Sequence, residues 1–131
     1  MHDQDTSVEV LRERVRRFVG EREWQSFHNP KNLSMSLAIE AAELMELFQW
    51  LTLDEARQRA ADPQFREAIA DEIADCLSYL LAMADAVGVD LTTELHRKME
   101  KNAVKYPREK SIGRADPPES TQTPESTQTP E

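Results

Sequence analysis

Two pairs of carboxylates lie inside the two most apolar segments of this otherwise strongly charged chain. Glu40 and Glu43 occur in MSLAIEAAELMELFQWL, and Glu72 and Asp75 occur in AIADEIADCLSYLLAMA. In each pair the second acid follows the first by three residues, which places both side chains on one face of a helix. Carboxylates are costly to bury without a positive partner, and four facing acids repel one another. We therefore expect hard divalent cations between them and a metal-dependent reaction on a phosphate substrate.

Each acidic pair shares its helical face with an aromatic residue that could contact a ligand beside the metal. Trp50 follows Glu43 by seven residues, and Tyr79 follows Glu72 by the same interval. A single acidic pair is common on solvated surface helices, and a solvated acidic face remains the competing interpretation. Two pairs in apolar surroundings, both with an aromatic at the same interval, favour a metal site.

The ligand types narrow the choice of metal. Oxygen ligands alone indicate Mg²⁺ or Mn²⁺ rather than zinc. A di-iron site in a helical bundle uses Glu-x-x-His motifs, and none of His2, His28 or His96 follows a glutamate by three residues. The number of metal ions stays open. Two further acids have a spacing that would also pair them with the first four: Glu46 and Asp71.

The elements that must position these residues are predicted to be helices throughout. The chain has three glycines, no Asn-Gly or Asp-Gly turn and no sustained alternation of polar and apolar residues. Capping signals place the helix starts, including Thr6 with Glu9, Thr52 with Glu55, and Asp62 before Pro63. The predicted helices span about 6–23, 32 or 34 to 51, 52–61, 63–87 and 90–106. We expect an all-α bundle of four main helices with one short connecting helix.

Composition limits the domain organisation and the partners. We expect a flexible N-terminus at 1–5, one domain at 6–110 and a disordered Pro/Ser/Thr-rich tail at 111–131, where PESTQT occurs twice. The net charge of −9 argues against nucleic-acid binding. The polar N-terminus is no signal peptide, no 18-residue apolar run suggests a membrane span, and Cys76 is expected in the core. These features predict a cytoplasmic protein.

Several short motifs resemble those of a known family. EAAE at 40–43, a gap of 28 residues, EIAD at 72–75 and KNAVKYP at 101–107 resemble the MazG-like, all-α nucleoside triphosphate pyrophosphohydrolases. EREWQSFHNPKN before the first pair and ELFQW after it are most similar to the dCTP pyrophosphatase branch. The resemblance covers about residues 8–110.

The resemblance implies a fold, an assembly and a reaction. It implies a helical bundle assembled as a dimer or as a dimer-of-dimers tetramer. It also implies cleavage between the α- and β-phosphates, which gives a nucleoside monophosphate and pyrophosphate. Glu40, Glu43, Glu72 and Asp75 match the family's catalytic Mg²⁺ ligands, and Mn²⁺ could replace Mg²⁺. Which of Glu40 and Glu43 would activate the attacking water stays open.

The resemblance also implies substrate contacts, although core packing is the competing role for the aromatic residues. Ring faces can hold a flat base. Three residues fall where the dCTP branch surrounds the base: Trp24, His28 and Trp50. Three fall in the segment that approaches the phosphates or sugar: Asn102, Lys105 and Tyr106. Two further candidates for substrate contact are Lys31 and Tyr79.

The preferred base is the least constrained part of the prediction. The eukaryotic dCTP enzymes are expected to carry a histidine where Val15 stands, so modified cytosines, dUTP or dTTP remain alternatives. Two other functions stay open. One is an all-α dUTP/dTTP-type hydrolase, and the other is a non-catalytic regulatory helical bundle.

Overall fold

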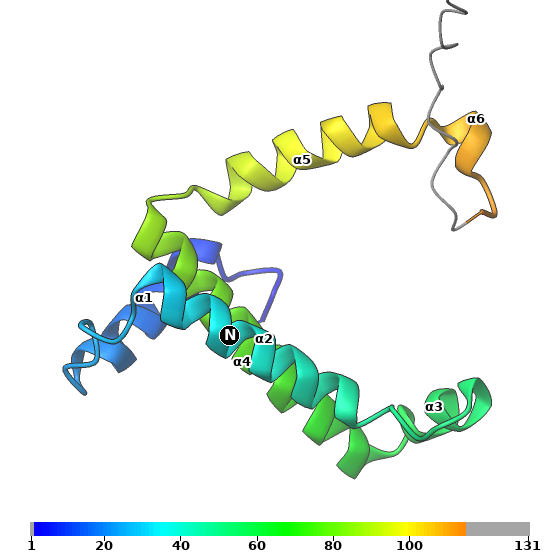
Figure 1. The fold of residues 1–131 in the computed structure, drawn as a ribbon, viewed down its shortest axis with the longest axis horizontal. Helices are drawn as coiled ribbons and strands as arrows, with labels where there is room; N and C mark the ends of the chain where they lie inside the picture. The colour runs from blue at the N-terminus through cyan, green and yellow to red at the C-terminus, as the bar shows by residue number, and fades with distance from the viewer. Residues whose placement is uncertain (1, 115–131) are drawn as a thin grey trace, which may run out of the picture. The chain divides into compact units, whose positions relative to one another are not determined.

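The computed structural model describes residues 2–114, and within them the regular elements are all helices (Figure 1). The predicted all-α class is confirmed. The chain divides into two compact units, one ending at Leu91 and one beginning at Thr92. The helices are α1 (Val8–Gly20), α2 (Pro30–Glu46), α3 (Leu53–Arg59), α4 (Pro63–Val87), α5 (Leu91–Lys105) and α6 (Arg108–Ser111). The sequence predicted the first five of these and missed α6.

The long helices α2 and α4 lie side by side and form the centre of the first unit (Figure 1). They run antiparallel: Ser36 near the start of α2 shares a pocket with Tyr79 late in α4, while Met45 near the end of α2 shares a groove with Ile69 early in α4. This pairing places the middle of α2, with its EAAE motif, opposite the EIAD motif of α4.

Helix α1 packs on α4 and is joined to it by an ion-pair cluster. The Arg12 guanidinium donates to the Asp85 carboxylate, with Nε 2.7 Å from Oδ1. Arg16 donates from Nε to Oδ2 of the same carboxylate at 2.6 Å, and from Nη1 to Glu9 at 2.7 Å. Asp85 of α4 accepts hydrogen bonds from two arginines on successive turns of α1. The cluster therefore helps to fix the position of α1 along the axis of α4.

The start of α2 differs from the prediction of a cap at Asn32 or Ser34. Asn29 is the N-cap: its side-chain oxygen accepts a hydrogen bond from the backbone N–H of Asn32 at 3.0 Å. Pro30 occupies the first helical turn, where its missing N–H costs nothing. The predicted start at 32 or 34 was therefore too late, because Pro30 begins the helix rather than interrupting a loop.

The other predicted helix starts and ends were partly confirmed. In α1 the cap is Ser7, whose hydroxyl accepts from Val10 N at 3.4 Å, rather than the predicted Thr6. The predicted capping box at Thr52 and the predicted start at Asp62 are confirmed. Helix α4 ends as predicted at Gly88, which has φ 67° and ψ 36°. Two predicted helix ends were too late, since α1 stops at Gly20 and α2 at Glu46.

Few side chains are fully buried in either unit. The buried apolar residues of the described chain are Val19, Leu33, Leu81, Ala82 and Ala84. The second unit contains most of α5 and all of α6, and two apolar residues of α5, Leu95 and Met99, are exposed. A single chain therefore leaves much of its apolar side-chain surface in contact with solvent.

The boundaries of the predicted domain at 6–110 stay predictions, because Met1 and residues 115–131 lie outside the described residues. None of the helices within residues 2–114 combines the length and the apolar character needed to cross a bilayer.

Candidate functional site

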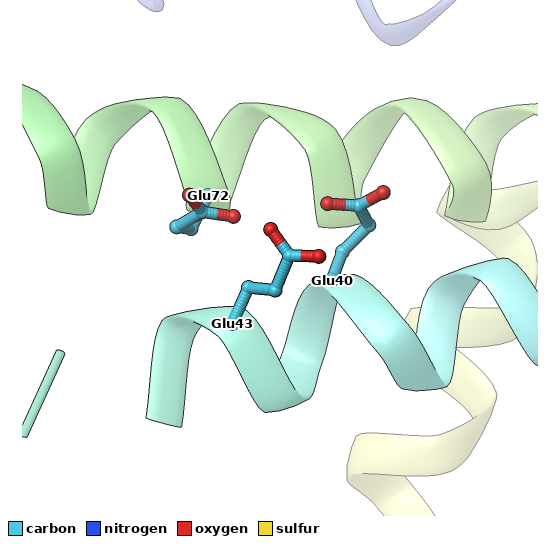
Figure 2. A group of neighbouring side chains, drawn as sticks. All are labelled: Glu40, Glu43 and Glu72. Atoms are coloured by element: carbon cyan, nitrogen blue, oxygen red, sulfur yellow. The ribbon is translucent and has the colours of Figure 1, made fainter. Parts of the chain in front are cut away.

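The antiparallel pairing of α2 and α4 brings three of the four predicted carboxylates together. Glu40 and Glu43 of α2 point toward Glu72 of α4 across the seam between the two helices (Figure 2). Each offers one carboxylate oxygen, and these three oxygens all lie within 4.8 Å of one another. Oxygens at this spacing can share one divalent cation, because a metal ligated at about 2.0–2.5 Å joins ligands separated by up to twice that distance.

The acids perturb one another electrostatically. Desolvation is the main cause that raises the pKa of Glu40 above its ordinary 4.5, followed by the charges of Glu43, Asp75 and Glu72. Desolvation likewise raises the pKa of Glu72, followed by the charges of Glu43, Asp75 and Asp71. Ionisation of all the acids in the cluster is therefore unfavourable, and a cation would relieve the repulsion between their charges.

The surroundings of one carboxylate oxygen show whether the cluster is suited to a metal ion. Oε2 of Glu72 is buried and has no hydrogen-bond partner. A buried carboxylate oxygen without a partner carries a desolvation cost that a metal ligand bond would remove. The orphaned oxygen, the three-oxygen group and the all-oxygen donor set together fit a hard divalent cation of the Mg²⁺ or Mn²⁺ type.

Asp75, the fourth predicted ligand, lies close enough to act on the charges of Glu40 and Glu72. Among residues 2–114, however, the group with all ligand oxygens within 4.8 Å consists of the other three acids. The rival candidates Glu46 and Asp71 are also outside that group, although Asp71 adds to the field on Glu72. The role of Asp75 as a metal ligand stays a prediction.

A pocket of about 340 Å³ lies along the same seam, on the side toward the start of α2. Two predicted substrate residues, His28 and Tyr79, line it. Tyr79 follows Asp75 by one helical turn, and Ser36, which also lines the pocket, precedes Glu40 by one turn. The pocket is therefore adjacent to the acid cluster and could hold the part of a ligand that does not bind metal.

Three predicted substrate residues of the first unit are absent from the lining of this pocket. Trp24 packs its ring edge-on against Phe18, with ring centroids 6.1 Å apart. Trp50 is 86% exposed in the turn after α2, and Lys31 is exposed on the first turn of α2. The interval that places Trp50 on the face of Glu43 requires an unbroken helix, and α2 ends at Glu46. A contact of these three with substrate stays a prediction.

The remaining predicted substrate residues belong to the second unit. Asn102 is half-buried on α5, and its backbone carbonyl accepts a hydrogen bond from Tyr106 N at 2.8 Å. The Lys105 ammonium lies 5.1 Å from the Tyr106 ring centroid, within the range of a cation–π contact. These residues form one local group at the end of α5, and their contact with substrate stays a prediction.

The pocket also contains residues that the sequence did not single out as functional. Phe27, Asn32 and Ser36 all line it. A signal for two of them was present, because Asn32 and Ser36 precede Glu40 by two turns and one turn and so continue its helical face. Phe27 carried no such signal, since its position depends on the loop before α2.

Known proteins resemble this chain in sequence and in fold. Residues 35–116 match the MazG-like family, a segment that contains both acidic motifs. A pyrophosphatase structure from Archaeoglobus fulgidus superimposes with a TM-score of 0.73 at 38% identity, covering 82% of this chain and 99% of that one.

Curated relatives come from mammals. dCTP pyrophosphatase 1 of Rattus norvegicus is 39% identical over 111 residues, covering 85% of this chain and 65% of the relative. The Homo sapiens protein of the same name is 39% identical over 103 residues, covering 79% of this chain and 61% of the relative. The chain thus spans less than two thirds of the length of these relatives, and its similarity to the dCTP pyrophosphatase branch is confirmed. Since the family match covers well over half of its residues, the chain belongs to the MazG-like family.

Proposed function

We propose that this chain is a metal-dependent nucleoside triphosphate pyrophosphohydrolase. It converts dCTP, or another pyrimidine deoxynucleoside triphosphate, into the monophosphate and pyrophosphate. The observation that carries the proposal is the group of three carboxylate oxygens within 4.8 Å of one another, one belonging to a residue with a buried, unpartnered oxygen. The names of the mammalian relatives and of the archaeal structure support the reaction class.

The acids would hold Mg²⁺ or Mn²⁺ against the triphosphate. Glu40, Glu43 and Glu72 supply the ligands, and Asp75 is the fourth. A bound divalent cation neutralises phosphate charge and lowers the pKa of a water. Glu43, the most exposed of the three, and Glu40 are the candidates to accept the proton of the water that attacks the α-phosphorus.

The pocket would hold the nucleoside. Its position along the α2–α4 seam supports a substrate oriented with the base toward Phe27 and His28 and with the phosphates toward the acids. Tyr79 lies between these two ends and would contact the sugar. We also propose contacts from Trp24, Lys31 and Trp50 around the base. Further contacts with phosphate or sugar would come from Asn102, Lys105 and Tyr106.

One incubation series tests the reaction. Each ribo- and deoxynucleoside triphosphate is incubated with the protein, with and without Mg²⁺, and the products are separated. We expect monophosphate and pyrophosphate, only with metal, and fastest from a pyrimidine deoxynucleotide. Glu43→Gln should lose turnover while its helical circular dichroism is unchanged, and Asp54→Asn on the exposed face of α3 serves as the control. Release of orthophosphate, or normal turnover by Glu43→Gln, would refute the mechanism.

The same series separates the alternatives. A dUTP/dTTP-type hydrolase would prefer uracil or thymine nucleotides over dCTP. A non-catalytic regulatory bundle would release no pyrophosphate from any nucleotide. A cytoplasmic location is part of the proposal.

Self-association is also part of the proposal, as a homotetramer or a dimer. A second, largely apolar groove of about 680 Å³ lies on the α2–α4 pair and is lined by Ala41, Leu44, Met45, Phe48, Gln49, Ile69 and Ile73. Met45 and Ile73 are more than half exposed there. Contiguous apolar surface of this kind is typical of a protein interface. Sedimentation velocity should give two or four times the mass of one chain, and a monomer would contradict this part.

A further inference from the structure

The wall of the nucleoside pocket comes from two sources. Six of its residues belong to the helices α2 and α4, whose positions are determined by their mutual packing. The other two, Phe27 and His28, belong to the loop that precedes α2. Backbone turns shape this loop: Phe27 N donates to Trp24 O at 2.9 Å, and His28 N donates to Gln25 O at 3.2 Å. These bonds fold the loop on itself but do not fix it to the helix.

A side-chain hydrogen bond joins the Phe27 end of the loop to the helix. Nδ2 of Asn32, on the first turn of α2, donates a hydrogen bond to the backbone carbonyl of Phe27 at 3.1 Å. The backbone N–H of the same residue donates to the Asn29 side chain at 3.0 Å. Asn32 is itself half-buried and lines the pocket. Its amide therefore fixes the distance between the loop wall and the helical wall of the pocket.

We propose that Asn32 is a positioning residue for nucleoside binding. This inference rests on the proposed function, because it assigns the pocket to the nucleoside end of the substrate. Asn32 holds Phe27 and His28 against α2, so that the loop wall is formed before the ligand arrives. A pre-formed wall avoids the free-energy cost of ordering the loop on binding. The acid cluster, two helical turns further along α2, does not depend on this bond.

The residue type follows from the bond. Asparagine carries both a donor and an acceptor, whereas an ionised aspartate only accepts. Asn32→Asp therefore keeps the size of the side chain and removes the donor that reaches Phe27 O. Asn32→Ala removes the whole side chain, and Asn32→Gln keeps the donor on a longer side chain.

The test measures the two ends of the substrate separately. Binding of dCMP reports on the pocket, and inhibition by inorganic pyrophosphate with Mg²⁺ reports on the acid cluster. We expect Asn32→Asp and Asn32→Ala to raise the Kd for dCMP and the KM for dCTP about fivefold, the effect of one neutral hydrogen bond. The kcat and the pyrophosphate inhibition constant should stay within a factor of two. Asn32→Gln should recover part of the loss.

A stability control excludes a merely structural effect. Ser7→Ala removes the cap of α1, which contributes no residue to the pocket, and should lower stability without changing dCMP binding. Unchanged dCMP binding by Asn32→Asp in an active enzyme would refute the role of Asn32 alone. If the protein binds dCMP through Asn32 but hydrolyses no nucleotide, the proposed reaction fails and the positioning role stands. Equal changes in dCMP and pyrophosphate binding by Asn32→Asp would also refute the positioning role, because the effect would then not be confined to the pocket.

Discussion

Replacing Asp85 by asparagine should lower the free energy of unfolding by about 2 kcal/mol. Asp85 lies on α4 and receives hydrogen bonds from both Arg12 and Arg16 of α1. It is also the acid through which α1 is fixed to the helix that carries Glu72. The substitution keeps the size and shape of the side chain, removes its charge and replaces one of its two acceptor oxygens by an N–H donor.

The magnitude follows from the exposure of the partners. The side chains of Arg12 and Asp85 are only 13% and 22% exposed. A charge-assisted hydrogen bond in such surroundings contributes about 1.5–3 kcal/mol, because water screens it weakly. The Arg16 side chain is 40% exposed, so its ion pair with Asp85 adds little to the free energy of unfolding. For a domain of this size, about 2 kcal/mol corresponds to a fall in Tm of about 8 °C.

The pH dependence gives the prediction a second signature. Hydrogen bonds from Arg16 and then Arg12 hold the pKa of Asp85 below its ordinary 3.8, although partial burial opposes them. A depressed pKa means that the stabilisation is present above the unfolded-state value and is lost as the pH falls through the folded-state value. The difference between wild type and Asp85→Asn should be constant from about pH 7 to 5 and should shrink below about pH 4.

Urea unfolding at several pH values, followed by circular dichroism at one fixed protein concentration, measures both effects. Asp54→Asn is a matched control, because Asp54 pairs with Arg57 at 3.3 Å on an exposed helix face. That change should cost less than about 0.5 kcal/mol. Equal losses in the two variants, or an Asp85 effect that persists unchanged at pH 3, would refute the assigned contribution of the cluster.

Two further predictions concern the acid cluster and the end of α4. Because the pKa values of Glu40 and Glu72 are raised, their favourable contribution is present below the unfolded value near 4.5 and is lost as the pH rises through the folded values. The Tm of the metal-free protein should thus fall as the pH rises above about 4.5. Mg²⁺ should restore the Tm, and Glu72→Gln should weaken both responses. An equal Mg²⁺ shift in this variant would contradict the site. Gly88→Ala should lower the free energy of unfolding in urea by about 1 kcal/mol, because the left-handed φ of 67° is unfavourable for alanine. A Cβ at this position meets no atom within 4 Å, so no steric clash adds to this loss. A neutral effect would show that the backbone relaxes.

Most of the local structure could be predicted from the sequence because its causes lie within a few residues. Thr52 with Glu55, Asp62 with Pro63, and Gly88 each act through hydrogen bonds or backbone angles of one helical turn. The same holds for the acidic pairs, whose shared faces follow from helical periodicity alone. Errors arose where two local signals competed, as at Asn29 and Pro30, where a helix start resembled a loop.

Relations across the seam between α2 and α4 could not be predicted from spacing. Periodicity places Glu43 and Trp50 on one helical face, but it does not show that α2 stops at Glu46 and leaves Trp50 exposed. Periodicity also does not show that the Asn32 side chain donates a hydrogen bond to the Phe27 carbonyl and so links the loop to α2. Loop conformation depends on contacts with elements that the loop's own residues do not specify.

Local sequence signals were enough to show that this protein is helical, where α3 and α4 start, and that four acids lie in pairs on two helical faces. Packing of α2 against α4 was needed to bring one carboxylate oxygen each of Glu40, Glu43 and Glu72 within 4.8 Å of one another. The same packing buries one oxygen of Glu72 without a hydrogen-bond partner. The physical reason is the range of the interactions: helix formation depends on neighbours within about four residues, whereas the antiparallel alignment of α2 with α4 depends on packing between segments about 30 residues apart.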